Sequence, residues 1–192
     1  YAPAELTAYT VGTKNRFLNR TVTANLEFYY YDYKNYQLQL VQGTNFLSVS
    51  SPARIFGAQM DLAFRPTPDD DLAINGAVQN AEIRDRTPAT ANLFIRSGVP
   101  VSIFGYDLPN APRVTINASW THRFELANGG RIETLAQTYY SSGYWMVFTQ
   151  DVNTRQGKYT NTDLTLTYRA PADRWSVSAF VRNLEDKAVF VG

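Results

Sequence analysis

Apolar and polar residues alternate with a period of two along most of the chain, and this pattern restricts the fold more than any other feature. In the clearest segment an apolar set alternates with a polar set, namely Val22, Ala24, Leu26, Phe28 and Tyr30 with Thr21, Thr23, Asn25 and Glu27. The same alternation recurs at 56–65, 113–124, 163–169 and 175–182, and more weakly at about 4–14, 72–84 and 131–142. Since successive side chains of a strand point to opposite faces, the pattern predicts about eight strands with two unlike faces.

Short and long connections alternate between the predicted strands. The short ones are rich in the Pro, Gly, Asn and Asp of tight turns and lie at 15–20, 66–71, 127–130 and 170–174. The long ones lie at about 36–52, 85–111 and 143–158. This order places every short turn at one end of the sheet and every long loop at the other, as in outer-membrane barrels with short periplasmic turns and long extracellular loops.

A soluble β-sandwich also shows alternation, but three features favour a transmembrane barrel. The predicted strands are about ten to fourteen residues long, which suits a tilted membrane crossing better than the shorter strands of soluble sheets. One face carries ionisable groups in mid-strand (Glu27, Asp61, Arg123 and Asp163), and the opposite face is almost purely apolar. Aromatic residues gather at strand ends, as in 28–33, which is typical of interfacial girdles. The predicted fold class is all-β, a transmembrane antiparallel β-barrel.

Composition excludes several other classes. The formal net charge is +1 and no basic run is interleaved with aromatics, so no nucleic-acid partner is expected. Mean hydropathy is −0.31, and no apolar run approaches the roughly 18 residues of a transmembrane helix. Cysteine is absent, which excludes disulfides and thiolate chemistry.

No catalytic or metal-binding constellation is apparent, so we predict no enzyme, cofactor or metal. His122 is the only histidine and falls on the apolar face near a short turn, which indicates an interfacial residue. The run 69–71 of three aspartates is best interpreted as a solvated turn beside two prolines. Asp151 and Asn153 lack EF-hand spacing, and no nucleotide-binding or serine-hydrolase motif occurs.

The candidate ligand contacts lie beside or within the third long connection. They combine aromatic rings with a cation at the predicted extracellular mouth, and they are Tyr139, Tyr140, Tyr144, Trp145 and Arg155, with Phe148 and Lys158 nearby. The first of them have a second interpretation, as part of the upper aromatic girdle.

Several segments resemble, in order, motifs of the last third of TonB-dependent outer-membrane receptor barrels. The opening 5–14 (ELTAYTVGTK) is similar to a family strand, although Thr10 stands where glutamate is common. A short turn and a tyrosine-rich strand ending at 31–36 follow, as in the family. Segment 53–59 (ARIFGAQ) resembles the motif A-x-x-x-G-x-E, with Gln59 replacing the acid.

The later motifs are similar to the family as well. Segment 108–113 (LPNAPR) resembles the entry L-P-x-A-P to a downward strand. Segment 175–187 resembles the penultimate strand, with its signature N-L-x-D-K at Asn183, Leu184, Asp186 and Lys187. Each motif alone is weak, but together they cover nearly the whole chain.

The resemblance implies a closed barrel of about 22 strands with a plug domain inside it. On this plan residues 1–192 are the C-terminal portion of the barrel, roughly strands 14 to 21, without the plug, the TonB-contacting box and the last strand. We therefore expect a fragment of a longer protein. The inner charges, which include Glu133, Arg169 and Arg182, are then either a hydrated wall or contacts with the plug or the substrate.

The resemblance also implies a function: TonB-dependent uptake of a scarce ligand such as a ferric siderophore, cobalamin or a glycan. The expected location is the bacterial outer membrane. The expected partners are membrane lipid, TonB through the missing N-terminal region, and a small-molecule or metal-chelate ligand bound by a monomeric receptor. Two alternatives stay open, a passive porin-like channel and a soluble β-sheet binding module.

Overall fold

Eight strands form one antiparallel sheet in the computed structural model, which describes residues 3–42, 45–86, 95–96, 99–100 and 102–190. The strands lie side by side in chain order: β1 (Glu5–Phe17), β2 (Val22–Gln42), β3 (Asn45–Phe64), β4 (Asp70–Ile83), β7 (Val114–Glu125), β8 (Arg131–Ser141), β11 (Tyr159–Arg169) and β12 (Ser176–Val181). The prediction of about eight alternating strands is confirmed. None of the helices in the described part of the chain has the length and hydropathy that spanning a bilayer requires.

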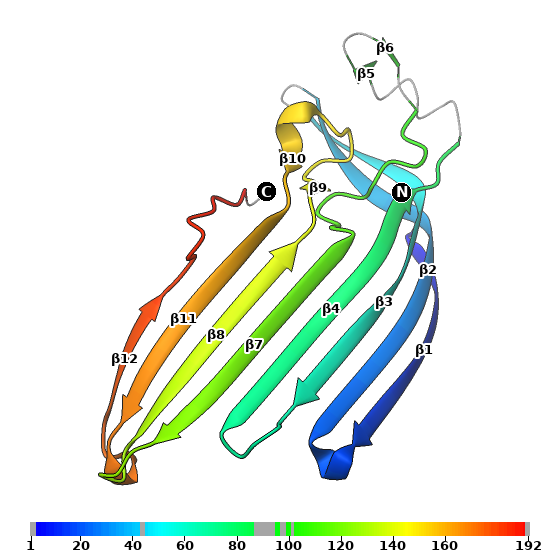
Figure 1. Ribbon diagram of the computed structural model, residues 1–192. Coiled ribbons are helices and arrows are strands. Elements are labelled where there is room, and N and C mark those ends of the chain that lie inside the picture. Colours follow the sequence, from blue (N-terminus) through cyan, green and yellow to red (C-terminus); the bar gives the residue numbers. More distant parts are fainter. Residues whose placement is uncertain (1–2, 43–44, 87–94, 97–98, 101, 191–192) are drawn as a thin grey trace.

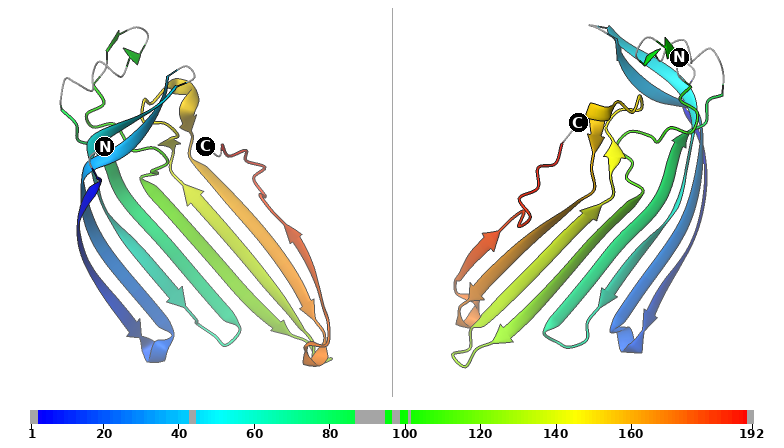
Figure 2. Two further views of the ribbon diagram at one scale, coloured as in Figure 1. Left: turned by 180° about the vertical axis from the view of Figure 1, so that it is seen from behind. Right: turned by 45° about the horizontal axis from the view of Figure 1, so that its top comes forward.

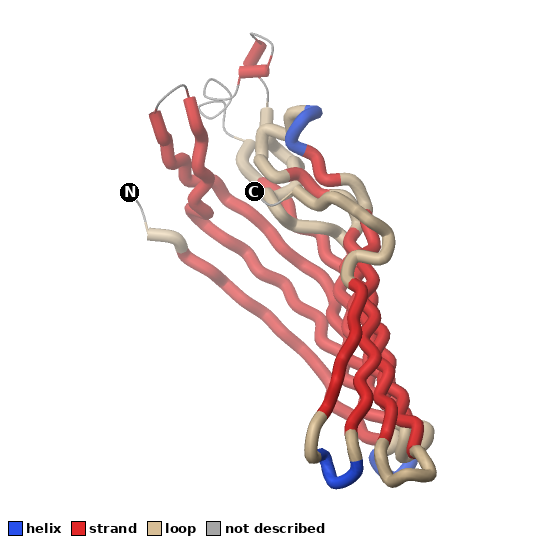
Figure 3. The backbone as a smooth tube through the Cα atoms, turned by 90° about the vertical axis from the view of Figure 1, so that its left-hand side faces the viewer, coloured by secondary structure: helices blue, strands red, loops and turns tan. Residues whose placement is uncertain are grey.

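The sheet is one curved, open layer. β1 and β12 lie at its opposite edges, and the views in Figures 1 and 2 show them apart. Seen from the side, the eight strands lie in a single layer, and no second sheet of comparable size faces it in the described chain (Figure 3). This arrangement is a segment of barrel wall and not a sandwich of two packed sheets.

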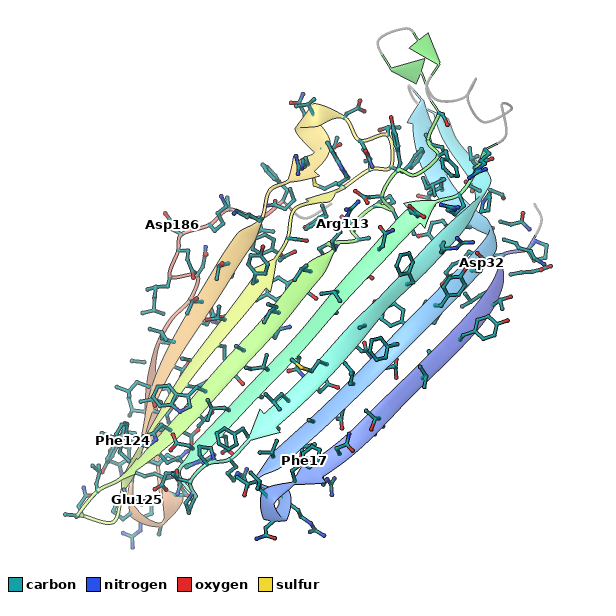
Figure 4. The ribbon with its side chains drawn as sticks, turned by 45° about the vertical axis from the view of Figure 1, so that its right-hand side comes forward. Phe17, Asp32, Arg113, Phe124, Glu125 and Asp186 are labelled. Carbon is teal, nitrogen blue, oxygen red and sulfur yellow. The ribbon has the colours of Figure 1, made fainter. Side chains whose placement is uncertain are left out.

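The short connections all lie at one end of the sheet. They are the turns at 18–21, 65–69, 126–130 and 170–175, which include the short helices η1 (Leu18–Arg20) and η3 (Pro171–Asp173). Figure 4 places Phe17, Phe124 and Glu125 at this turn end, and Asp32 and Arg113 toward the loop end. The predicted short turns are confirmed to within a few residues.

The turn between β7 and β8 shows how the sequence directs these reversals. Gly129 has φ +77°, a left-handed conformation that glycine adopts without strain. Its amide donates to the carbonyl of Leu126 at 2.9 Å, and the Asn128 side chain accepts from the amide of Gly130 at 2.9 Å. The Asn and Gly residues that predicted the turn therefore also make its hydrogen bonds.

The long connections lie at the other end and carry two small hairpins. One pairs β5 (Ile95–Arg96) with β6 (Val99–Pro100), and the other pairs β9 (Tyr144–Trp145) with β10 (Arg155–Gln156), with the helix η2 (Val152–Thr154) before β10 (Figure 1). Parts of the predicted loop 85–111 fall outside the described residues. Its described part and the loop at 143–158 lie where the alternation of connections predicted them.

The predicted long loop at 36–52 is wrong. β2 and β3 instead continue as one long hairpin, with Tyr36 opposite Ser51 and Gln42 opposite Asn45, after a shift of register between Tyr33 and Tyr36. This register shift is a β-bulge, which accommodates the unequal number of residues on the two strands. Beyond it the backbones of β2 and β3 stay paired even though the alternation of their side chains weakens.

The strand register sorts the side chains onto two faces. Leu26 lies opposite Met60 on one face, which we call the outer face, and Asn25 lies opposite Asp61 on the other, the inner face. Outer-face side chains stay uncovered: Phe28 is 52% exposed and Trp120 is 47% exposed. An apolar face without any protein covering it is the face expected to meet hydrocarbon.

The buried core lies at the loop end and not along the sheet. Its members come from the upper parts of β2 to β4 and from two loops: Leu38, Ala53, Ala81, Ile83, Ile103, Leu108 and Phe148. Backbone hydrogen bonds hold one loop against β4, since Ile83 donates to Tyr106 at 2.8 Å and Leu108 donates to Ala81 at 2.9 Å. The long loops are thus packed onto the end of the wall.

Candidate functional site

A polar groove of about 640 Å³ runs along the inner face from β4 to β11. It is lined mainly by amide, phenol and carboxyl side chains, among them Asn75, Asn117, Gln137, Tyr139, Asn161 and Asp163. The register explains the gathering, because Asn117 lies opposite both Asn75 and Tyr139, and Tyr139 lies opposite Asn161. The groove offers many hydrogen-bond donors and acceptors and little charge.

Two of the predicted inner-face acids, Glu27 on β2 and Asp61 on β3, are paired with amide side chains. Asn75 donates through Nδ2 to Asp61 Oδ1 at 2.7 Å, and Gln59 donates through Nε2 to Glu27 Oε1 at 3.1 Å. Both carboxylates therefore have a partner on the adjacent strand. The placement of Glu27, Asp61 and Asp163 on the polar face agrees with their position in the alternation.

A chain of ion pairs crosses the inner face at the turn end. Arg123 lies 2.7 Å from Asp71 and 3.8 Å from Glu133, and Glu133 lies 3.9 Å from Arg169. The buried Nε of Arg169 has no hydrogen-bond partner. These side chains are partly exposed, and the charges of Arg123 and Arg169 balance those of Asp71 and Glu133. They therefore form a polar surface with little net charge.

Tyr29 on β2 and Gly57 on β3 make a close contact on the inner face of the sheet. The Tyr29 ring stacks on Tyr31 with centroids 5.2 Å apart, and its hydroxyl is 3.4 Å from Gln79 Oε1. A Cβ at Gly57 would come within 2.7 Å of the Tyr29 hydroxyl and within 2.3 Å of the Val78 carbonyl. Tyr29 therefore crosses β3 only because Gly57 has no side chain. The sequence carried one signal of this contact, the glycine of segment 53–59.

The structure separates the candidate mouth residues into three places. Trp145 and Arg155 meet on the β9–β10 hairpin, where the guanidinium lies 5.3 Å from the indole centroid in a cation–π contact. Tyr144 lies beside Trp145 on β9. Tyr139 faces the inner groove with its ring 5.7 Å from that of Tyr159, a residue that the sequence reasoning missed.

Two other aromatic residues near the mouth lie elsewhere. Tyr140 falls on the outer face, opposite Ile116 and Thr160. Phe148 is only 3% exposed and belongs to the loop core, so its ring is not open to a ligand. Tyr140 takes the face opposite to that of Tyr139 because successive residues of a strand alternate between faces, whereas the burial of Phe148 depends on packing between loops and has no local signal.

The family signature at 183–187 forms a turn and not the end of a strand, since β12 stops at Val181. Asn183 has φ +54°, and its side chain accepts from the Lys187 amide at 3.0 Å and donates to the Lys187 carbonyl at 3.3 Å. The amide of Leu184 donates to Thr162 on β11 at 2.9 Å. β12 agrees with the alternation at 175–182, and the signature follows it as a turn because the Asn183 side chain replaces strand pairing with local hydrogen bonds.

His122 lies on the outer face at the turn end, as its position in the alternation predicted. Its Nδ1 is 2.7 Å from Asp70 Oδ1, which also accepts from Trp120 Nε1 at 3.0 Å, and Thr67 donates to Asp70 Oδ2 at 2.7 Å. Asp70 thus joins the turn to the neighbouring strand. Among the described residues, no three His, Asp or Glu side chains are grouped as metal ligands.

Solved structures of larger proteins contain a β-sheet with the same fold as this chain. The ferric yersiniabactin uptake receptor FyuA from Yersinia pestis has a TM-score of 0.75 at 20% identity over 97% of this chain and 26% of its own. BauA, the ferric preacinetobactin receptor from Acinetobacter baumannii, has a TM-score of 0.71 at 14% identity over 98% of this chain and 26% of its own. The copper transporter OprC has a TM-score of 0.69 at 15% identity over 98% and 26%.

The chain therefore spans about a quarter of the length of these structures, which share its fold at low identity. No curated protein matches it in sequence. A family model described as "TonB dependent receptor-like, beta-barrel" matches residues 1–184, which is nearly the whole chain. Together with the open, two-faced antiparallel sheet, this match shows that the chain belongs to the TonB-dependent receptor β-barrel family.

Proposed function

We propose that this chain is part of the wall of an outer-membrane receptor that takes up a scarce ligand with energy delivered by TonB. The supporting observation is the two-faced, open sheet within a family match over residues 1–184. Its outer face is apolar and uncovered, and its inner face is polar and grooved. Such a wall separates hydrocarbon from a hydrated interior, as a transport barrel requires.

The proposed location is the bacterial outer membrane, and the unpaired edges of the sheet support a closed barrel there. β1 and β12 each have one side without a strand partner in the described chain. In hydrocarbon each unpaired peptide group costs several kcal/mol, so these edges need further strands of the same receptor. In this proposal the complete protein is a monomeric closed barrel, and it contacts TonB through a region N-terminal to this chain.

The proposed ligand is a small molecule or metal chelate bound at the loop end. Solved relatives are described as receptors for ferric yersiniabactin and ferric preacinetobactin and as a copper transporter. Trp145, Arg155 and Tyr144 on the small hairpin offer rings and a cation, which suit a ligand with aromatic or anionic groups. Tyr139 continues this surface into the inner groove, while Tyr140 belongs to the aromatic girdle.

Uptake by cells that lack the full-length gene tests the proposal. A deletion strain is supplied with single ferric siderophores, copper, cobalamin or glycans, and uptake of each labelled compound is measured with and without the gene restored in trans. We expect one ligand class to require the gene. If every ligand enters equally well in both strains, the receptor proposal fails.

The energy requirement separates a receptor from a porin-like channel. Uptake through a TonB-dependent receptor stops when TonB is deleted or the proton gradient is collapsed, whereas passive diffusion through a porin continues. We expect both treatments to reduce uptake to the level of the deletion strain. Undiminished uptake after either treatment would favour the passive channel.

A further inference from the structure

An apolar groove of about 480 Å³ crosses β7, β8, β11 and β12 on the outer face, in the half of the sheet next to the short turns. The register explains the hollow. Ala136 lies between Trp120 and Leu164 in one cross-strand row, so a methyl group stands between two large side chains. In the next row Ala179 lies opposite Leu166, which extends the hollow onto β12.

The groove is open to its surroundings. Leu164 is 40% exposed and Leu166 is 50% exposed, and no described residue covers them. An empty apolar hollow forfeits the dispersion contacts that its walls could make. Whatever lies against this part of the outer face therefore gains more contact than it would on a flat wall.

The polar cluster beside the groove indicates its depth in the membrane. His122 packs edge-on against Phe124 with ring centroids 4.2 Å apart, and its Nδ1 meets Asp70. The indole nitrogen of Trp120 also reaches Asp70. Aromatic rings with polar atoms pointing to one end mark the level of lipid headgroups, so the groove begins where the hydrocarbon begins.

We propose that this groove holds one acyl chain of a phospholipid from the leaflet on the short-turn side. The inference rests on the proposed membrane location. In outer-membrane barrels the short turns are periplasmic, so the leaflet at this level is the phospholipid one. The small side chain of Ala136 lies between the large side chains of Trp120 and Leu164. A flexible acyl chain in this groove contacts protein on three sides, whereas on a flat surface it would contact protein on one side.

Filling the groove tests the proposal. The complete receptor is purified from outer membranes in mild detergent, equilibrated with a phosphatidylethanolamine of defined chains, and its retained lipids are counted by native mass spectrometry. We expect the double variant Ala136→Leu/Ala179→Leu to retain one phospholipid fewer than wild type. The matched control is Ala24→Leu, the same change on the outer face of β2, outside the groove. It should retain the wild-type number.

The outcomes separate this proposal from the proposed function. If membrane fractionation does not find the receptor in the outer membrane, both fail. If it is found there and the double variant retains as much lipid as wild type, the groove proposal alone fails. Equal losses in the double variant and in Ala24→Leu would also overturn it, since the effect would then belong to the outer face in general.

A second measurement avoids dependence on how well the double variant folds. Phospholipids brominated in the acyl chain quench nearby tryptophans, and Trp120 lines the groove. In reconstituted receptor at a low fraction of brominated lipid, we expect the wild type to be quenched more than Trp120→Phe. The excess quenching should be lost in the milder single variant Ala179→Leu. Equal quenching in wild type and Trp120→Phe would overturn the proposal.

Discussion

Replacing Gly57 with alanine should weaken the wall at the contact between β2, β3 and β4. The new Cβ would lie 2.3 Å from the backbone carbonyl of Val78 and 2.7 Å from the hydroxyl of Tyr29. The Tyr29 ring can swing away, but the Val78 carbonyl belongs to the strand paired with β3 and cannot move without disturbing that pairing.

The cost can be bounded from these distances. Overpacking by one methyl group typically costs about 1–3 kcal/mol, and the upper part of this range applies where backbone must shift. We therefore expect Gly57→Ala to destabilise the complete receptor by about 3 kcal/mol. Adding Tyr29→Ala should restore only part of the loss, since it removes the ring and leaves the contact with Val78.

Gly76 on β4 provides the matched control. A Cβ there would meet its nearest atom, the Thr115 carbonyl, at 3.6 Å, which is an ordinary van der Waals distance. Gly76→Ala should be neutral or slightly stabilising, because alanine reduces the freedom of the unfolded chain. The assay is urea unfolding of the purified receptor in detergent micelles, followed by the shift in gel migration between folded and unfolded barrel. Identical midpoints for Gly57→Ala and Gly76→Ala would refute the steric argument.

Three further predictions concern the loop end and the last turn. Loss of one cation–π contact with the ligand costs about 0.5–2 kcal/mol, so Trp145→Ala or Arg155→Ala should raise the ligand's dissociation constant about 2- to 30-fold. Tyr140→Ala should leave that constant unchanged, because Tyr140 lies on the outer face. Phe148→Ala should destabilise the packing of the loop core by about 3–5 kcal/mol. We expect faster proteolysis of the loops and an unchanged unfolding midpoint of the barrel, and equal proteolysis rates for the variant and the wild type would contradict this. Asn183→Ala should lower the free energy of unfolding in urea by about 1 kcal/mol. Asn183→Asp keeps the acceptor for the Lys187 amide and should lower it less, and the reverse order would exclude the turn as the cause.

Most of the strands, their two faces and the end of the sheet at which each connection lies can be predicted from the amino-acid sequence alone. Each of these is encoded locally: a period of two assigns Leu26 and Asn25 to opposite faces whatever the rest of the chain does. Turn residues such as Gly129 act within four residues of chain. The resemblance to TonB-dependent receptors rested on short motifs of the same local kind, and the family match over 1–184 agrees with it.

The coordinates were needed to show how far strand pairing continues and which side chains meet across strands and loops. The extension of β2 and β3 past Tyr36, the burial of Phe148 and the passage of Tyr29 over Gly57 all join residues distant in sequence or depend on strand register. The same holds for the groove around Ala136, whose neighbours come from β7 and β11. Alternation fixes which face a residue takes, but the register between strands determines its neighbours on that face, and register depends on backbone pairing along the whole sheet.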